Sequence, residues 1–156
     1  FRSVIGDSLG LQDLFYGTLE ENITVGKKDI KIEDMLWAIE QVRLGDFFKS
    51  LPKGLNTMIQ PEGQGLSTSI KQKILLARTL AEKPKLIVMD HTLQGLDFED
   101  RKHISSILTD PKNSWTLLAA TSDPLMLSKC DKVVTMEHGT IVDIDIKKKV
   151  TKPKSK

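Results

Sequence analysis

The run Leu86-Ile87-Val88-Met89 constrains the fold more than any other part of this chain. Four consecutive apolar residues are typical of a strand that is buried on both faces of a parallel sheet. Residues 115–120 form a second such run, and they predict a second buried strand. A helix is predicted between them, at about residues 97–108. Strands that alternate with helices in this way predict an α/β core.

The residues before the first strand are expected to be mainly helical. Apolar residues recur every three to four positions from Glu33 to Val42, which predicts a helix there. Asp46 is expected to cap a short second helix that ends at Pro52. A third helix is predicted from about residue 69 to residue 83, before Pro84. Residues 53–67 are rich in Gly, Pro and Gln and show no period, so they are predicted to be a loop.

The end of the chain is predicted to contain a short helix, a hairpin and a tail. The helix is expected over residues 124–129, and the hairpin from residues 132–136 and 140–142. Six of the 23 basic residues lie in the last ten positions. Without those six, 17 basic residues face 21 acidic ones, which gives −4 for the body although the whole chain carries +2. The body therefore gives no electrostatic reason to expect nucleic acid, and the tail is expected to be a solvated, flexible end.

Length and composition fit one soluble globular domain. The chain has 156 residues, of which 39% are hydrophobic and 28% charged. No apolar run reaches the roughly 18–20 residues that a membrane-spanning helix needs. The single cysteine, Cys130, cannot form a disulfide within the chain. Because the first residue is Phe1 rather than Met, we expect the chain to be a piece of a longer protein.

Asp90 is the first residue that indicates chemistry. It follows the apolar run directly, at the predicted carboxyl end of a strand, where open α/β sheets place their ligand sites. In P-loop NTPases an Asp at this place holds Mg²⁺ on the nucleotide. Taken alone, Asp90 fits equally well an ordinary polar residue that ends a strand.

The motifs around Asp90 resemble the nucleotide-binding domain of ABC transporters, from the signature loop through Walker B to the D-loop. The match continues in both directions without gaps, covers about residues 1–145, and looks like the exporter branch upstream. The motifs that carry it are Leu14-Phe15, Gly17-Thr18, Glu21-Asn22-Ile23, Leu51-Pro52-Lys53-Gly54, Gly65-Leu66-Ser67, Leu76-Ala77-Arg78, Leu86–Asp90, Leu96-Asp97 and Asp131 through Gly139.

This resemblance implies a fold and a division of the chain. The fold would be a truncated P-loop NTPase (RecA-like) α/β core with an inserted α-helical subdomain. Residues 1–26 would belong to the core and include the Q-loop region, and residues 27–83 would be the helical subdomain, ending in the signature helix. Residues 84–146 would carry Walker B, the D-loop and the switch region, and residues 147–156 the basic flexible tail.

Several positions depart from the family pattern. No Walker A motif, G-x-x-x-x-G-K-[ST], occurs in the chain, which a truncation explains because that motif precedes the Q-loop. Truncation does not explain the other departures. In ungapped register, the Q-loop glutamine is Gly10, the catalytic glutamate is His91 and the switch histidine is Ser122. The signature Leu-Ser-Gly-Gly-Gln reads Leu66-Ser67-Thr68-Ser69-Ile70.

The resemblance also implies a site. ATP would be bound with Mg²⁺ in the full-length protein, with Asp90 addressing the metal, and this chain alone is expected to bind neither. Catalytic side chains are not intact, because His91 and Ser122 stand where a glutamate and a histidine are expected. The nucleotide-facing positions would be Gly10, Ser67, Thr68, Ser69, Ile70, Asp90 and Asp97. Retention of Ser67, Asp90 and Asp97 is equally compatible with inheritance of the fold without the function.

The function implied is that of the C-terminal part of an exporter's ATP-binding domain, with weak or absent hydrolysis. Its partners would be a transmembrane domain and a second nucleotide-binding domain, identical or different, at the cytoplasmic side of the membrane. The alternative is a pseudo-ATPase module that dimerises or regulates without turnover. An intact Walker A and membrane spans upstream of this chain would favour the first reading.

Overall fold

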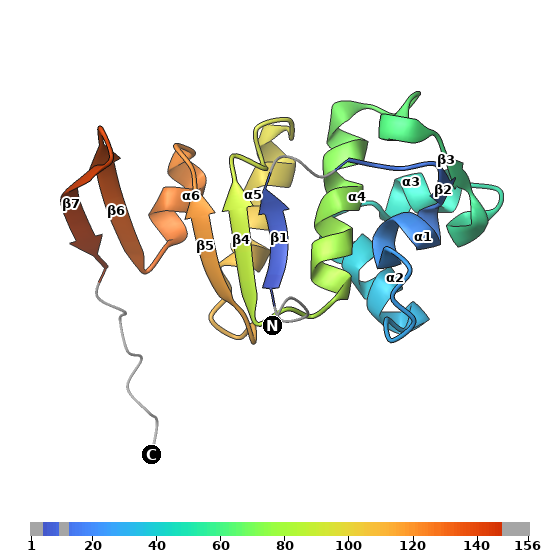
Figure 1. Cartoon of the computed structure of the whole chain (residues 1–156), viewed down its shortest axis with the longest axis horizontal. Helices are drawn as coiled ribbons and strands as arrows, with labels where there is room; N and C mark the ends of the chain where they lie inside the picture. Colours follow the sequence, from blue (N-terminus) through green and yellow to red (C-terminus); the bar gives the residue numbers. More distant parts are fainter. Residues whose placement is uncertain (1–4, 10–12, 148–156) are drawn as a thin grey trace, which may run out of the picture.

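A small parallel sheet lies beside a group of helices (Figure 1). The computed structural model describes residues 5–9 and 13–147. The sheet consists of β1 (Ile5–Leu9), β4 (Leu86–Asp90) and β5 (Thr116–Ala120), in the order β1-β4-β5, and both pairings are parallel. The α/β character that the alternating pattern predicts is therefore confirmed.

Helices α5 (Phe98–Leu108) and α6 (Pro124–Lys129) lie on the same face of this sheet, behind it in Figure 1. The side chains that β4 turns toward them, Ile87 and Met89, are buried. The opposite face is open within the described residues, and Leu118 on it is 61% exposed. The prediction of strands buried on both faces is thus wrong for β5, because no described element covers the second face.

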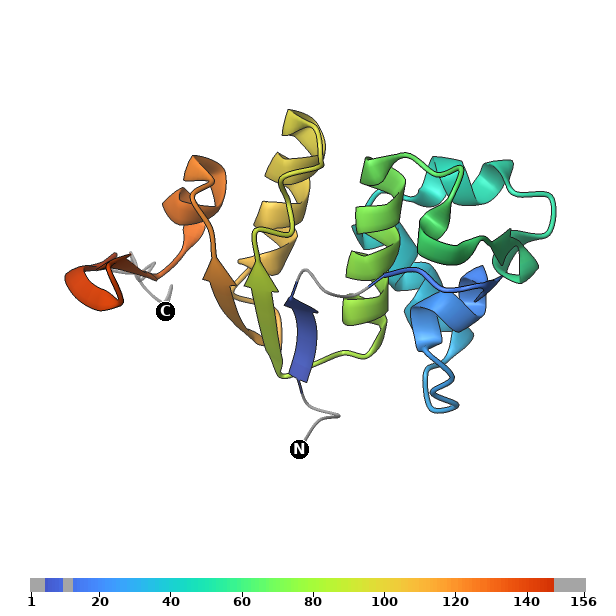
Figure 2. The ribbon, with the colours of Figure 1, turned by 45° about the horizontal axis from the view of Figure 1, so that its top comes forward.

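The helical group is built around α4 (Thr68–Ala81), which packs against α1 (Leu19–Thr24) and α2 (Ile32–Gln41). Figure 2 shows α4 standing between the sheet and the other helices. The predicted period is confirmed in α2, where Met35 and Ile39 are buried. Along α4, the side chains that fill the core are Ile74, Leu76, Ala77, Leu80 and Ala81.

Two details of the helical group differ from the predictions. Helix α3 (Gly45–Ser50) begins after Leu44, which makes no side-chain capping bond, and Asp46 lies inside its first turn rather than at its cap. Residues 53–67 are not a plain loop. They contain two 3₁₀ turns, Gly54–Asn56 and Pro61–Gly63, and strand β3 (Met58–Ile59), which pairs with β2 (Gly17–Thr18).

The predicted C-terminal hairpin is confirmed as β6 (Lys132–Glu137) and β7 (Thr140–Ile146), which pair antiparallel. Within the described residues neither strand pairs with β5, and most side chains of the hairpin are exposed. Residues 148–156 of the predicted tail, and Gly10 at the Q-loop position, lie outside the described residues. Among the described helices, none combines the length and apolarity needed to cross a bilayer.

Candidate functional site

The carboxyl edge of the sheet carries three of the predicted site residues, Asp90, His91 and Ser122. Asp90 ends β4 and stands opposite Ala120, the last residue of β5. The backbone N–H of His91 donates to the carbonyl oxygen of Ala120 at 3.0 Å, which joins the two strand ends. Ser122 follows two residues later and is exposed. The sequence-based placement of Asp90 at a strand end, where α/β sheets hold ligands, is confirmed.

His91 turns back onto Asp90. The ring Nδ1 of His91 lies 2.7 Å from Oδ1 of Asp90, and both side chains are about half exposed. His91 has φ +49°, in the left-handed region that residues other than glycine seldom adopt. An imidazole can bond to the carboxylate in this position, whereas a second carboxylate there would repel it. The Nδ1 atom of His91 is therefore engaged with Asp90.

Asp90 fits a magnesium ion that is held mainly by a nucleotide. Mg²⁺ is usually bound in proteins by one or two carboxylates, with phosphate and water oxygens completing its octahedron. Asp90 supplies one such carboxylate at an open edge. No group of three or more His, Cys, Asp or Glu side chains in the described part of the chain could hold a metal ion by itself.

A second set of predicted residues lies at the start of α4. Ser67 is the N-cap of this helix, and its Oγ accepts a hydrogen bond from the backbone N–H of Ile70 at 3.3 Å. Ser67 and Thr68 are exposed, as a binding role requires. Ile70 is half-buried and packs against the hydrophobic core. At this position of the predicted signature, its hydrocarbon side chain contributes apolar packing rather than hydrogen bonding.

Asp97 begins α5 at the same end of the molecule, the upper end in Figure 1. Its Oδ1 accepts from the backbone N–H of Asp100 at 2.8 Å, so Asp97 is the N-cap of α5. The loop between β4 and α5 touches the start of α4 at Gly95. A Cβ built on Gly95 would lie 2.8 Å from Cγ2 of Thr68 and 2.7 Å from Oε1 of Gln72. The structure thus brings the predicted signature and D-loop segments into contact.

Sequence reasoning missed the role of Arg78. This side chain is buried, its Nε donates to the carbonyl oxygen of Asn22 at 2.7 Å, and its Nη2 donates to that of Asp13 at 3.3 Å. Its guanidinium carbon lies 5.9 Å from the ring centre of Phe15. Burial lowers the pKa of Arg78 below its ordinary value. An arginine within an apolar helical run was the sequence feature that could have indicated a buried anchor. Through Arg78, α4 holds the segment before α1.

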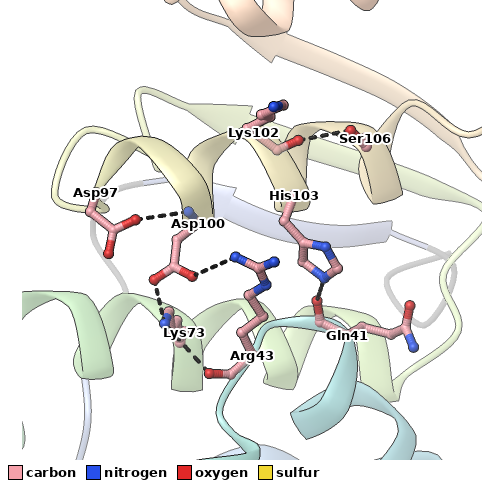
Figure 3. A network of polar contacts seen from close by, with 8 residues as sticks. All are labelled: Gln41, Arg43, Lys73, Asp97, Asp100, Lys102, His103 and Ser106. Carbon is pink, nitrogen blue, oxygen red and sulfur yellow. Dashed lines mark hydrogen bonds and ion pairs between the residues drawn. The ribbon is translucent and has the colours of Figure 1, made fainter.

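A second missed feature is a charged network between α4, α5 and the α2–α3 turn (Figure 3). Lys73 forms an ion pair with Asp100, and Arg43 approaches the same carboxylate. The sequence shows these charges, but residues 43, 73 and 100 are far apart along the chain. No local pattern relates them.

Comparisons with known proteins agree with this geometry. The chain is 32% identical over 143 residues to the "Putative multidrug export ATP-binding/permease protein YgaD" of Bacillus subtilis (strain 168), which covers 92% of this chain and 25% of that protein. It is 30% identical over 131 residues to the "ATP-dependent lipid A-core flippase" of Idiomarina loihiensis, with 83% and 22% covered. It is 30% identical over 131 residues to "Multidrug resistance protein pgp-1" of Caenorhabditis elegans, with 84% and 10% covered. No protein-family model matches the chain.

The fold has a counterpart among solved structures. The structure of a bacterial Atm1-family ABC exporter with ATP bound aligns with a TM-score of 0.82 at 23% identity, over 92% of this chain and 25% of the other. The chain thus spans a quarter or less of the relatives and of the solved structure that it matches.

Proposed function

The chain belongs to the ABC transporter family, and we propose that it is the C-terminal part of an exporter's nucleotide-binding domain, in which ATP acts more as a clamp than as a fuel. The observation that carries the proposal is the set of polar side chains at one end of the molecule. Asp90 ends β4, Ser67 begins α4 and Asp97 begins α5, all at the end toward which the parallel strands run (Figure 1).

Each of these residues has a proposed role. Asp90 would hold Mg²⁺ on an ATP whose phosphates are bound by a Walker A loop outside this chain. Ser67 and the first turn of α4 would face the ATP bound by a second nucleotide-binding domain, identical or different. ATP with its Mg²⁺ supplies the negative charge and the binding energy that draw the two domains together.

Residues 27–83 would form the helical subdomain and contact the transmembrane domain at the cytoplasmic side of the membrane. The arrangement of α2, α3 and α4, which lie together beside the sheet, supports this division (Figure 2). Helix α1, from the segment before residue 27, packs against α4 as well, so the helical group begins earlier than this boundary. Residues 84–147 contain β4, β5, the two helices that cover one face of the sheet and the β6–β7 hairpin.

The residues at the edge of the sheet support the proposal of weak hydrolysis. A general base contributes about 10²–10⁴-fold to a reaction of this type. His91 stands at the base position, and its Nδ1 is engaged with Asp90. Ser122 has no ring that could carry a proton or a positive charge near the terminal phosphate. The first turn of α4 carries Thr68 and Ser69 where glycines would let backbone N–H groups approach phosphate closely.

ATP binding by the full-length protein tests the proposal. We expect Mg²⁺-dependent ATP binding and ATP-driven dimerisation, both weakened at least about tenfold by Asp90→Asn and unchanged by Asp143→Asn, which alters an exposed carboxylate on β7. Residues 1–156 alone should not bind ATP at micromolar concentrations, because they lack a phosphate-binding loop.

Two results would contradict this proposal. Dimerisation of the full-length protein without any ATP binding would favour the alternative, a pseudo-ATPase module that dimerises or regulates. Calorimetric detection of micromolar ATP binding by residues 1–156 would show that the proposed division of the site is wrong.

A further inference from the structure

Lys73 is a lysine in the interior of the molecule. Its side chain is 9% exposed, and that of its partner Asp100 is 10% exposed. The Nζ of Lys73 forms an ion pair with Oδ2 of Asp100 (Figure 3). Lysine and aspartate are almost never buried unless they are paired, and removal of one partner leaves an uncompensated charge in the interior. The pair therefore fixes α4 against α5.

Arg43 joins the pair to the helical group. Its Nη1 lies 3.7 Å from Oδ1 of Asp100, and its carbonyl oxygen accepts from Nζ of Lys73 at 3.5 Å. Arg43 has φ +56° just after α2, where helices usually place glycine. Nearby, Nε2 of His103 lies 3.1 Å from the carbonyl oxygen of Gln41. The α2–α3 turn is thus bound to both α4 and α5, and we call Lys73, Asp100 and Arg43 the three-charge junction.

The junction lies close to the starts of both helices. Asp100 is in the first turn of α5, and its backbone N–H is held by the carboxylate of Asp97 at 2.8 Å. Lys73 is in the second turn of α4, whose N-cap is Ser67. The contact of Gly95 with Thr68 and Gln72 leaves no space for a side chain between the two segments. Asp100 therefore contacts both helix starts. Its backbone N–H bonds to the Asp97 carboxylate, and its own carboxylate pairs with Lys73 on α4.

We propose that the three-charge junction is a positioning device that keeps Ser67 and Asp97 in one fixed arrangement and ties both to the α2–α3 turn. Lys73 and Asp100 contact no nucleotide in this account. They act through the helix starts that they hold. The inference rests on the proposed function for its consequence, since Ser67 would meet a partner's ATP only when the two helix starts move as one unit with the helical group.

Amide hydrogen exchange tests the positioning without any nucleotide. Three backbone N–H groups report on the joined segments: Leu44 donates to Ile39, Lys71 to Ser67 and Arg101 to Asp97, at 2.9–3.0 Å. We expect Lys73→Met and Asp100→Asn each to speed exchange at all three amides about tenfold. The double variant should be no faster than the single variants, because the pair is already broken.

Controls separate positioning from general loss of stability. Lys102→Met and Glu99→Gln alter exposed charges on α5 and should leave the three amides unchanged. The amides of Val25 and Cys130, which are bonded in α1 and at the end of α6, serve as references. Equal acceleration of the reference amides, or acceleration at only one of the three reporters, would overturn the inference.

A second measurement uses the full-length protein. Lys73→Met should raise the ATP concentration for half-maximal dimerisation about tenfold and leave its extent at saturating ATP unchanged, whereas Lys73→Arg should stay within about twofold of the unmodified protein. An unchanged ATP requirement in Lys73→Met would overturn the inference. If the unmodified protein does not respond to ATP, the proposed function fails, and the exchange pattern alone then decides whether the junction positions the two helix starts.

Discussion

At the scale of single residues, two buried cations on α4 determine what this helix is attached to. Lys73 points to α5, and Arg78 points to the segment before α1. Because both side chains belong to α4, this helix links α5, which begins after Asp97, to α1 and the segment that precedes it. Arg78 achieves this with hydrogen bonds to two backbone carbonyl oxygens, those of Asn22 and Asp13.

Replacement of Arg78 should therefore destabilise the fold. In Arg78→Met the carbonyl oxygens of Asn22 and Asp13 each lose a charged donor. Because hydrogen bonds to charged groups contribute about 1.5–3 kcal/mol, we expect a loss of about 2 kcal/mol in the free energy of unfolding, measured by urea titration. Lys71→Met, on the same helix, is the matched control and should change it by less than about 0.5 kcal/mol. Equal stability of the two variants would show that Arg78 is not an anchor.

Some single residues of the site can be placed from the sequence, and others cannot. Asp90 was placed correctly because an acidic residue after four apolar ones is a local signal. Lys73, Asp100 and Arg43 were missed because only the fold brings residues 43, 73 and 100 together. Ser67 was expected to face a nucleotide, and the structure adds that its hydroxyl also caps α4.

At the scale of elements, α1 shows how a very short helix is held. Thr18 and Glu21 form a capping box: Oγ1 of Thr18 accepts from the N–H of Glu21 at 3.1 Å, and Oε2 of Glu21 accepts from the N–H of Thr18 at 2.7 Å. The backbone and hydroxyl hydrogen bonds from Thr18 lower the pKa of Glu21 below its ordinary value. Six residues cannot form a stable helix alone, so the box and the packing against α4 sustain α1.

The capping box should make stability depend on pH. A carboxylate whose pKa is lower in the folded state stabilises the fold above its unfolded pKa of about 4.3, and this contribution is lost as pH falls through the folded value. We expect the free energy of unfolding of Glu21→Gln, followed by urea titration, to approach that of the unmodified chain as pH falls below about 4. Thr18→Ala should also cost about 1 kcal/mol at pH 7 through loss of the N-cap. Glu20→Gln, an exposed neighbour, is the control, and an unchanged pH profile in Glu21→Gln would contradict the account.

Helices were predicted better than the segments that join them. The bounds of α2, α4 and α5 agree within about two residues because apolar spacing, N-caps and Pro84 are local signals. Strand β3 was missed because two residues become a strand only by pairing with Gly17 and Thr18, some forty positions earlier. Asp46 looked like a cap by composition, but the turn after α2 places Leu44 at that position.

For the molecule as a whole, the most conspicuous feature is the sheet face that no described element covers. Leu118 on β5, and Val134, Met136 and Ile144 on the hairpin, are exposed. Within the described residues β5 pairs only with β4, and β6 only with β7. Unpaired strand edges beside apolar surface are templates for association. An exposed edge or apolar face is expected from the sequence, but an apolar strand does not by itself indicate which of its faces is left uncovered.

Residues 1–156 should therefore self-associate as their concentration rises. We expect sedimentation velocity to show dimers or larger species, reduced by Leu118→Lys and by Val134→Lys, because a charge on an edge strand opposes pairing. Ser114→Lys places the same charge in an exposed loop and should leave association unchanged. A strictly monomeric species at millimolar concentration would show that the open face does not drive association.

In the proposed function, ATP clamps this domain without normal turnover. The most direct measurement is steady-state ATP hydrolysis by the unmodified full-length homodimer, beside an exporter that has the glutamate and the histidine at the positions of His91 and Ser122. We expect a rate lower by about 10²–10⁴-fold. The His91→Glu, Ser122→His double variant should hydrolyse ATP faster only where the Walker A loop and the partner's signature are intact. Hydrolysis by the unmodified homodimer at the rate of the comparison exporter would contradict this proposal.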